Sequence, residues 1–177
     1  MQPLKMKLSK RQLYVALLSI LMITRTATSK QQRKQFWTVP FAKGKTRIAI
    51  AIATTIKYKC SSIEKLFVVF PNETLKKQDE HAYQQLQTTV GNTFTIDLVV
   101  GLSSLDIEKP MQTVIVCDEA DYEIIDCNAT VPKVKAFIAM SATNPQNSSG
   151  FVNRLLSIQK ITSFDSGIKS SYNPDER

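Results

Sequence analysis

The chain has 177 residues, of which 43% are hydrophobic and 21% are charged. This length and composition suit one compact domain with a sizeable core and exclude a globally disordered chain. The net charge of +8 is unevenly placed, because residues 1–63 hold 13 Lys or Arg and no Asp or Glu, whereas residues 64–177 hold 10 basic against 15 acidic residues. A basic half of this kind is compatible with nucleic acid phosphates, with a targeting segment or with a solvated face.

Residues 1–34 form a basic N-terminal segment that contains an apolar stretch. Residues 1–12 are basic and the 11 residues of 13–23 are almost wholly apolar. That layout is typical of a secretory signal and also suits a mitochondrial presequence, but so short a stretch predicts no stable membrane insertion. We favour a buried helix over residues 11–24, packed on the sheet edge. The expected location is then intracellular, cytoplasmic or nuclear, with organellar or secretory targeting left open.

A phosphate-binding loop is predicted between a strand over residues 35–39 and an Ala- and Ile-rich helix over residues 47–58. A proline ends the strand, since proline cannot donate to a central ladder. Strand, loop, Gly-Lys-Thr and helix is the order of a phosphate loop, whose backbone N–H groups and helix N-terminus cradle phosphates. The lysine would neutralise the β and γ phosphates, and the threonine hydroxyl would bind magnesium. The predicted loop residues are Pro40, Phe41, Ala42, Lys43, Gly44, Lys45 and Thr46.

Two more strands and a polar helix are predicted after the loop. An apolar strand over residues 66–70 ends at Pro71, and the helix runs over residues 72–88. The Lys and Gln side chains of this helix either contact a nucleic acid backbone or form a solvated face. A strand over residues 93–100 and a loop over residues 101–110 follow.

A carboxylate pair follows the next buried strand. The strand covers residues 114–117, and Asp118 and Glu119 come directly after it. Such a pair at the end of a buried strand is costly unless something positive lies beside it. A magnesium ion on a nucleotide phosphate would satisfy it, with Asp118 as a metal-side anchor.

The remainder of the chain supplies one more strand. Residues 122–131 are predicted as a loop or helical turn, and residues 136–140 as an apolar strand that ends in Ser-Ala-Thr. A polar loop, a short helix over residues 151–158 and a polar tail from residue 163 complete the chain. Alternating strands and helices predict a single α/β domain with a mainly parallel sheet and helices on both faces, whose ligand lies at the carboxyl ends of the strands. The cysteines, which we expect to be reduced core thiols, are Cys60, Cys117 and Cys127.

Four motifs, in this order, resemble those of superfamily 2 helicases, and more narrowly the first RecA-like domain of DEAD-box and related DExx proteins. The motifs are Pro40 to Thr46, Pro71-x-x-x-Leu75-x-x-Gln78, Asp118-Glu119-Ala120-Asp121 and Ser141-Ala142-Thr143. The resemblance covers about residues 35–145. It implies a P-loop NTPase fold, with a helicase ATP-binding domain over residues 35–162 and a polar tail or linker over residues 163–177.

The resemblance also implies cofactors and catalytic roles. ATP and Mg²⁺ are the implied cofactors, held by Lys45 and Thr46, with Asp118 on the ion. Glu119 would orient the attacking water, so that the implied catalytic residues are Glu119, Asp118 and Lys45.

The implied partner is RNA or DNA. Ser141 and Thr143 would contact Asp121 and couple the ATP state to the grip on nucleic acid. The first nucleic-acid-facing motif of the family corresponds to Pro71, Leu75 and Gln78. Gln32 and Gln35 are candidates for an upstream adenine reader, although no clear motif supports either.

The chain departs from the family at two points. The usual loop is Pro-Thr-Gly-x-Gly-Lys-Thr, whereas Phe41 replaces the threonine and Ala42 the first glycine. The second RecA-like domain, which brings the arginine finger, is also missing, so we expect a fragment, a truncated paralogue or a half that works with such a domain in cis or in trans. Two rival hypotheses remain, a non-hydrolysing nucleotide-binding or interaction module, and a secreted or organellar protein with a coincidental acidic box.

Overall fold

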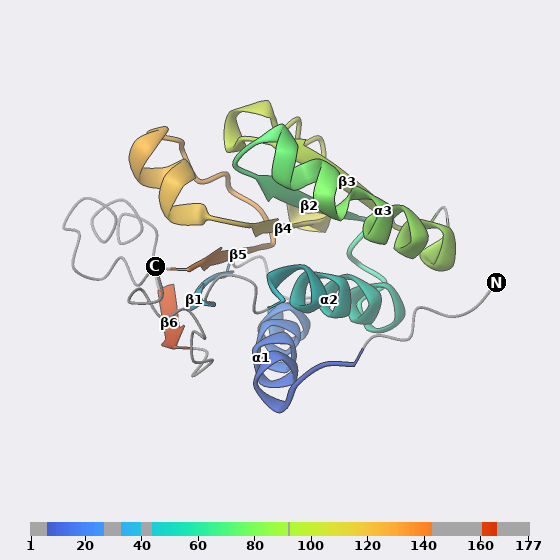
Figure 1. Cartoon of the computed structure of the whole chain (residues 1–177). Coiled ribbons are helices and arrows are strands. Elements are labelled where there is room, and N and C mark those ends of the chain that lie inside the picture. The colour runs from blue at the N-terminus through green and yellow to red at the C-terminus, as the bar shows by residue number, and fades with distance from the viewer. Residues whose placement is uncertain (1–6, 27–32, 40–43, 92, 143–160, 166–177) are drawn as a thin grey trace.

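The runs of β-branched and aromatic residues form a six-stranded sheet in the order β3-β2-β4-β5-β1-β6. The computed structural model describes residues 7–26, 33–39, 44–91, 93–142 and 161–165. Every neighbouring pair of strands is parallel, which confirms the predicted α/β fold with its parallel sheet (Figure 1). The strands are β1 (Arg33–Thr38), β2 (Lys65–Phe70), β3 (Thr95–Val100), β4 (Thr113–Cys117), β5 (Ala136–Ser141) and β6 (Ile161–Asp165).

The two faces of the sheet are covered differently. One face packs against the three α-helices, α1 (Lys10–Thr26), α2 (Lys45–Lys59) and α3 (Glu73–Val90). The other packs against the 3-10 helix η1 (Leu102–Ser104), the π-helix η3 (Tyr122–Asp126) and nearby loops. Alternate residues of β1 to β5 enter the two clusters, as the period of two requires. Helices therefore lie on both faces, but the long ones share a single face.

Helix α1 confirms the helix predicted in the N-terminal segment. It packs along α2 and reaches β1, so it covers the sheet next to α2 (Figure 1). Val15 and Ile23 are fully buried, whereas Leu13, Leu17 and Leu21 are 42–53% exposed. The helix is therefore buried along one side only. No helix in the described part of the chain combines the length and the apolar character needed to cross a membrane.

Several local features differ from the prediction. Strand β6 pairs with β1 and extends past residue 162, where we expected the domain to end and a polar tail or linker to begin. Strand β1 begins at Arg33, two residues before the predicted start at Gln35. Cys127 is exposed, unlike the other two cysteines, so the expectation of three core thiols was wrong at that position. The helix predicted over residues 151–158 lies outside the described residues.

Candidate functional site

The predicted loop and the acidic pair meet at the carboxyl edge of the sheet. Gly44 precedes α2 with φ 83°, and α2 begins at Lys45. On the neighbouring side, β4 ends at Cys117, and the Asp118 N–H donates to the Val69 carbonyl of β2 at 2.9 Å. Because parallel strands end at the same edge, segments 74 residues apart in the chain come into contact.

Lys45 forms ion pairs with both carboxylates of the acidic pair. Its Nζ is 2.8 Å from Asp118 Oδ1 and also donates to Glu119 Oε1. The side chain is 9% exposed. Burial alone would lower the pKa of Lys45, but the charges and hydrogen bonds of Asp118 and Glu119 outweigh it and raise the pKa above the ordinary 10.5. The site therefore holds one cation against two anions.

Glu119 adopts an unusual backbone conformation. Its φ is 47°, in the left-handed region that residues other than glycine adopt infrequently. Two interactions hold it there, because its N–H donates to Asp118 Oδ1 at 3.0 Å and its carboxylate accepts from Lys45. A conformation of this kind typically costs about 1–3 kcal/mol and is found at functional sites more often than elsewhere. Here it turns the Glu119 carboxylate back towards the start of α2.

A third carboxylate, Asp79 of α3, contacts the predicted metal ligand Thr46. The Thr46 hydroxyl donates to Asp79 Oδ2 at 2.5 Å. Burial and the nearby Asp118 raise the pKa of Asp79, although the hydrogen bond from Thr46 opposes the shift. Sequence reasoning missed Asp79, since 33 residues separate it from Thr46. The only local signal was that Asp79 directly follows Gln78, the last residue of the predicted nucleic-acid motif.

Gln12 of α1 lies against the loop glycine. A Cβ atom on Gly44 would come within 2.4 Å of Gln12 Nε2, and the positive φ would strain any other residue there. Gln12 is 9% exposed and its Oε1 accepts from the Ser9 N–H, while the Ser9 hydroxyl accepts from the Gln12 N–H. This is a capping box, and the spacing Ser-x-x-Gln was the signal that sequence reasoning overlooked.

The two candidates for an adenine-reading residue are Gln32 and Gln35. Gln35 is 5% exposed, and its amide bridges the Leu18 carbonyl of α1 and the Trp37 indole of β1. Its side chain therefore joins a helix to a strand inside the core. Gln32 lies outside the described residues.

A small pocket opens between α2, α3 and the sheet. Its polar lining comes from both helices and from the residue after β4, and its floor is apolar. Tyr83 of α3 closes one side, and burial together with the charges of Asp79 and Asp118 raises its pKa well above the usual range. The lining residues are Lys45, Thr46, Ala49, Val68, Phe70, Asp79, Tyr83, Val116, Asp118 and Met140.

Besides the ammonium of Lys45, the side chains that line this pocket offer hydroxyl and carboxylate oxygens. Oxygen ligands of this kind are the ones that Mg²⁺ prefers. Among the described residues, no group of three or more His, Cys, Asp or Glu is arranged to hold a metal ion on its own. A magnesium ion shared with a nucleotide needs only one or two protein ligands, because waters and phosphates complete its octahedron. Thr46 and Asp118 fit this requirement.

The predicted nucleic-acid residues lie around the start of α3. Pro71 follows β2, Asn72 caps α3 by accepting from the Leu75 N–H at 2.9 Å, and Gln78 is exposed. Leu75 packs partly against the core, so its side chain has a structural contact as well.

The predicted coupling residues are placed in part. Asp121 precedes the π-helix η3 and is half-buried, and Ser141 is fully buried at the end of β5. Both lie at the carboxyl edge of the sheet. Thr143 and the loop residues Pro40, Phe41, Ala42 and Lys43 lie outside the described residues.

Neither a protein-family model nor a curated protein matches this chain.

Proposed function

We propose that this chain is the ATP-binding domain of a superfamily 2 helicase or translocase, which binds Mg-ATP and couples its hydrolysis to binding or unwinding of RNA or DNA. The meeting of Lys45 and Thr46 with Asp118 and Glu119 at the carboxyl edge of a parallel sheet supports this proposal most strongly. Lys45 and Glu119 are 74 residues apart in the sequence, and the fold brings them together.

The chemistry of the site suits phosphate binding. The first N–H groups of α2 have no acceptor within the helix, and the positive end of the helix dipole lies there. Lys45 would turn from the two carboxylates towards the β and γ phosphates when a nucleotide enters. Magnesium would neutralise phosphate charge there. Thr46 and Asp118 are the residues that would hold it.

Glu119 is the residue proposed to orient the attacking water. Its side chain is one methylene longer than that of Asp118, so it reaches further from the end of β4 towards the position of the γ-phosphate. Lys45 releases this carboxylate when it moves to the phosphates, which frees Glu119 to accept a hydrogen bond from water. An arginine finger from a second RecA-like domain, in cis or in trans, would complete the site.

A second candidate function is a nucleotide-binding or interaction module that does not hydrolyse ATP. The substitutions Phe41 and Ala42 in the phosphate loop favour it, because the usual loop has threonine and glycine at these positions. Saturable ATP binding without phosphate release, with nucleic acid and a second RecA-like domain both supplied, would support this alternative.

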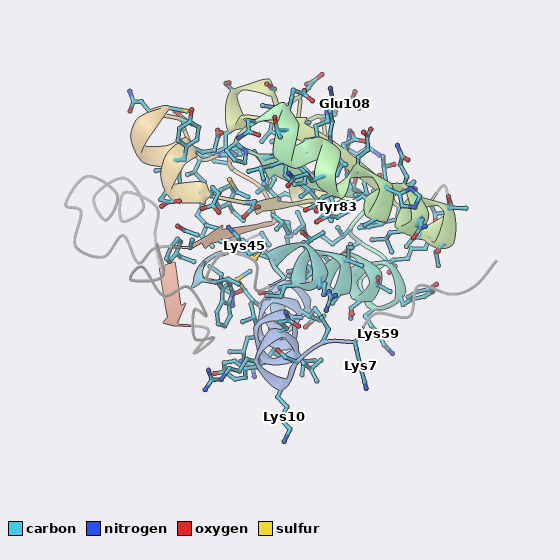
Figure 2. The ribbon with its side chains drawn as sticks, in the orientation of Figure 1. Lys7, Lys10, Lys45, Lys59, Tyr83 and Glu108 are labelled. Carbon is cyan, nitrogen blue, oxygen red and sulfur yellow. The ribbon has the colours of Figure 1, made fainter. Side chains whose placement is uncertain are left out.

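Binding of a fluorescent ATP analogue tests the proposed function. Hydrogen bonds to charged groups contribute about 1.5–3 kcal/mol each. We therefore expect Lys45→Ala to weaken binding roughly 10–100-fold. Lys59→Ala is the matched control, since Lys59 is the last residue of the same helix and lies far from the loop (Figure 2). Equal affinity of the parent and Lys45→Ala would refute the loop assignment.

A further inference from the structure

We propose that Asp79 is a positioning residue for magnesium, which holds the Thr46 hydroxyl in the orientation that the ion requires. The proposal rests on the proposed function, because it concerns the same nucleotide site. It assigns to α3 a role in Mg²⁺ dependence that none of the recognised motifs contains.

The geometry behind this inference is a contact between two helices. Thr46 lies in the first turn of α2 and Asp79 in the second turn of α3, and both helices begin at the carboxyl edge of the sheet. The hydroxyl donates to Asp79 Oδ2 at 2.5 Å, and both residues line the pocket that also contains Asp118. The bond therefore lies at the pocket that both predicted magnesium ligands, Thr46 and Asp118, line.

The direction of the hydrogen bond determines whether the Thr46 oxygen is available to a cation. An ionised carboxylate can only accept, so the hydroxyl proton of Thr46 points at Asp79. The lone pairs of the Thr46 oxygen are then directed away from Asp79 and into the pocket, where a cation can use them. Carboxylates that hold a metal ligand in this way typically change metal affinity 10–100-fold when they are mutated.

Two other roles for Asp79 lead to different expectations. If the bond only ties α3 to α2, its loss lowers stability and affects nucleotide binding equally with and without Mg²⁺. If the charge of Asp79 only repels phosphates, its loss strengthens binding in the absence of Mg²⁺ and leaves binding in its presence unchanged. Of these three roles, only the positioning role weakens binding selectively when Mg²⁺ is present.

The experiment measures the Kd of a fluorescent ATP analogue in excess Mg²⁺ and in EDTA for the parent chain and for Asp79→Ala, which removes the acceptor of the Thr46 hydroxyl. We expect the Kd in Mg²⁺ to rise about 10–100-fold, and the Kd in EDTA to stay within about twofold. Glu80→Gln is the matched control, because it removes the same charge from the next residue of α3 and should alter neither value. Thermal unfolding of each variant confirms that the fold is intact.

A double-mutant cycle with Thr46→Val tests whether Asp79 acts through the hydroxyl. In the Thr46→Val background, Asp79→Ala should have no further effect on the Kd in Mg²⁺. Equal Kd changes in Mg²⁺ and EDTA, a change in EDTA alone, or full additivity with Thr46→Val would overturn the positioning role. Absence of nucleotide binding by the parent chain in both conditions would refute the proposed function itself, and the positioning role with it. Should Asp79→Ala fail to fold, Asp79→Leu, which keeps the bulk of the side chain and also lacks an acceptor, takes its place.

Discussion

Lys45 should stabilise the fold as well as bind phosphate, because it is the cation that compensates two carboxylates at the end of β4. Lys45→Met keeps the length and apolar stem of the side chain and removes only the charge. At 2.8 Å and an effective dielectric constant of about 20, one such pair is worth roughly 6 kcal/mol before desolvation is subtracted. Breaking a fully buried pair costs about 3–5 kcal/mol. Because Asp118 and Glu119 are 18% and 15% exposed, water can solvate them in part, and we expect a loss of about 2–3 kcal/mol.

Urea unfolding followed by circular dichroism measures this loss. Lys59→Met, on the last residue of the same helix, should change stability by less than about 0.5 kcal/mol. Combining Lys45→Met with Glu119→Gln should recover part of the loss, since one uncompensated charge is removed. The pKa of Lys45 is raised above 10.5, so its contribution is complete below about pH 10.5 and is lost as the pH rises through the folded-state value. An unchanged unfolding midpoint for Lys45→Met at neutral pH would refute the claim that Lys45 stabilises the fold by compensating the two carboxylates.

Three further predictions concern the loop, a buried lysine and the acidic box. Gly44→Ala should destabilise by about 1–2 kcal/mol or more, through its positive φ and the contact with Gln12, and an unchanged urea midpoint would contradict this. Burial and the charge of Lys133 lower the pKa of Lys34 to about 8, so the folded chain binds fewer protons than the unfolded chain between pH 8 and 10.5 and its stability rises with pH across that window. Lys34→Met should therefore stabilise by about 2 kcal/mol at pH 7 and by almost nothing at pH 10.5, and a gain independent of pH in thermal unfolding would argue against this cause. Glu119→Gln should leave ATP affinity nearly unchanged yet remove hydrolysis when a second RecA-like domain is supplied, and phosphate release at the parent rate would exclude the helicase-type mechanism.

The strands of the fold were predictable because short apolar runs are bounded by proline and polar residues. Strand β4 was predicted over residues 114–117 and begins only one residue earlier. Strand β6 was missed because Ile161–Asp165 contains only two strongly apolar residues, and its pairing with β1 depends on tertiary structure. The early start of β1 was missed for a related reason, since Lys34 is charged and yet buried.

The residues of the candidate site were predictable where a short sequence motif by itself indicates a chemical role. Gly44, Lys45, Asp118 and Glu119 were identified from local sequence, and the parallel order of the strands explains why they meet. Asp79 was not identified, because its contact with Thr46 is set by how α2 and α3 pack and no local pattern encodes it. Gln12 was overlooked for the opposite reason, since its capping box was visible but was not connected to a loop 32 residues away.

Hydrogen exchange of the native chain with and without saturating Mg-ATP tests the central claim most directly. The N–H groups of the first turn of α2 have no acceptor within the helix, so they should exchange rapidly in the free chain. The Ile48 N–H donates to the Gly44 carbonyl at 3.1 Å and provides an internal reference. We predict that Mg-ATP slows exchange at Lys45, Thr46 and Arg47 and leaves the C-terminal turn of α2 unchanged. Unaltered exchange at the start of α2 under saturating Mg-ATP would contradict the claim that this loop binds nucleotide.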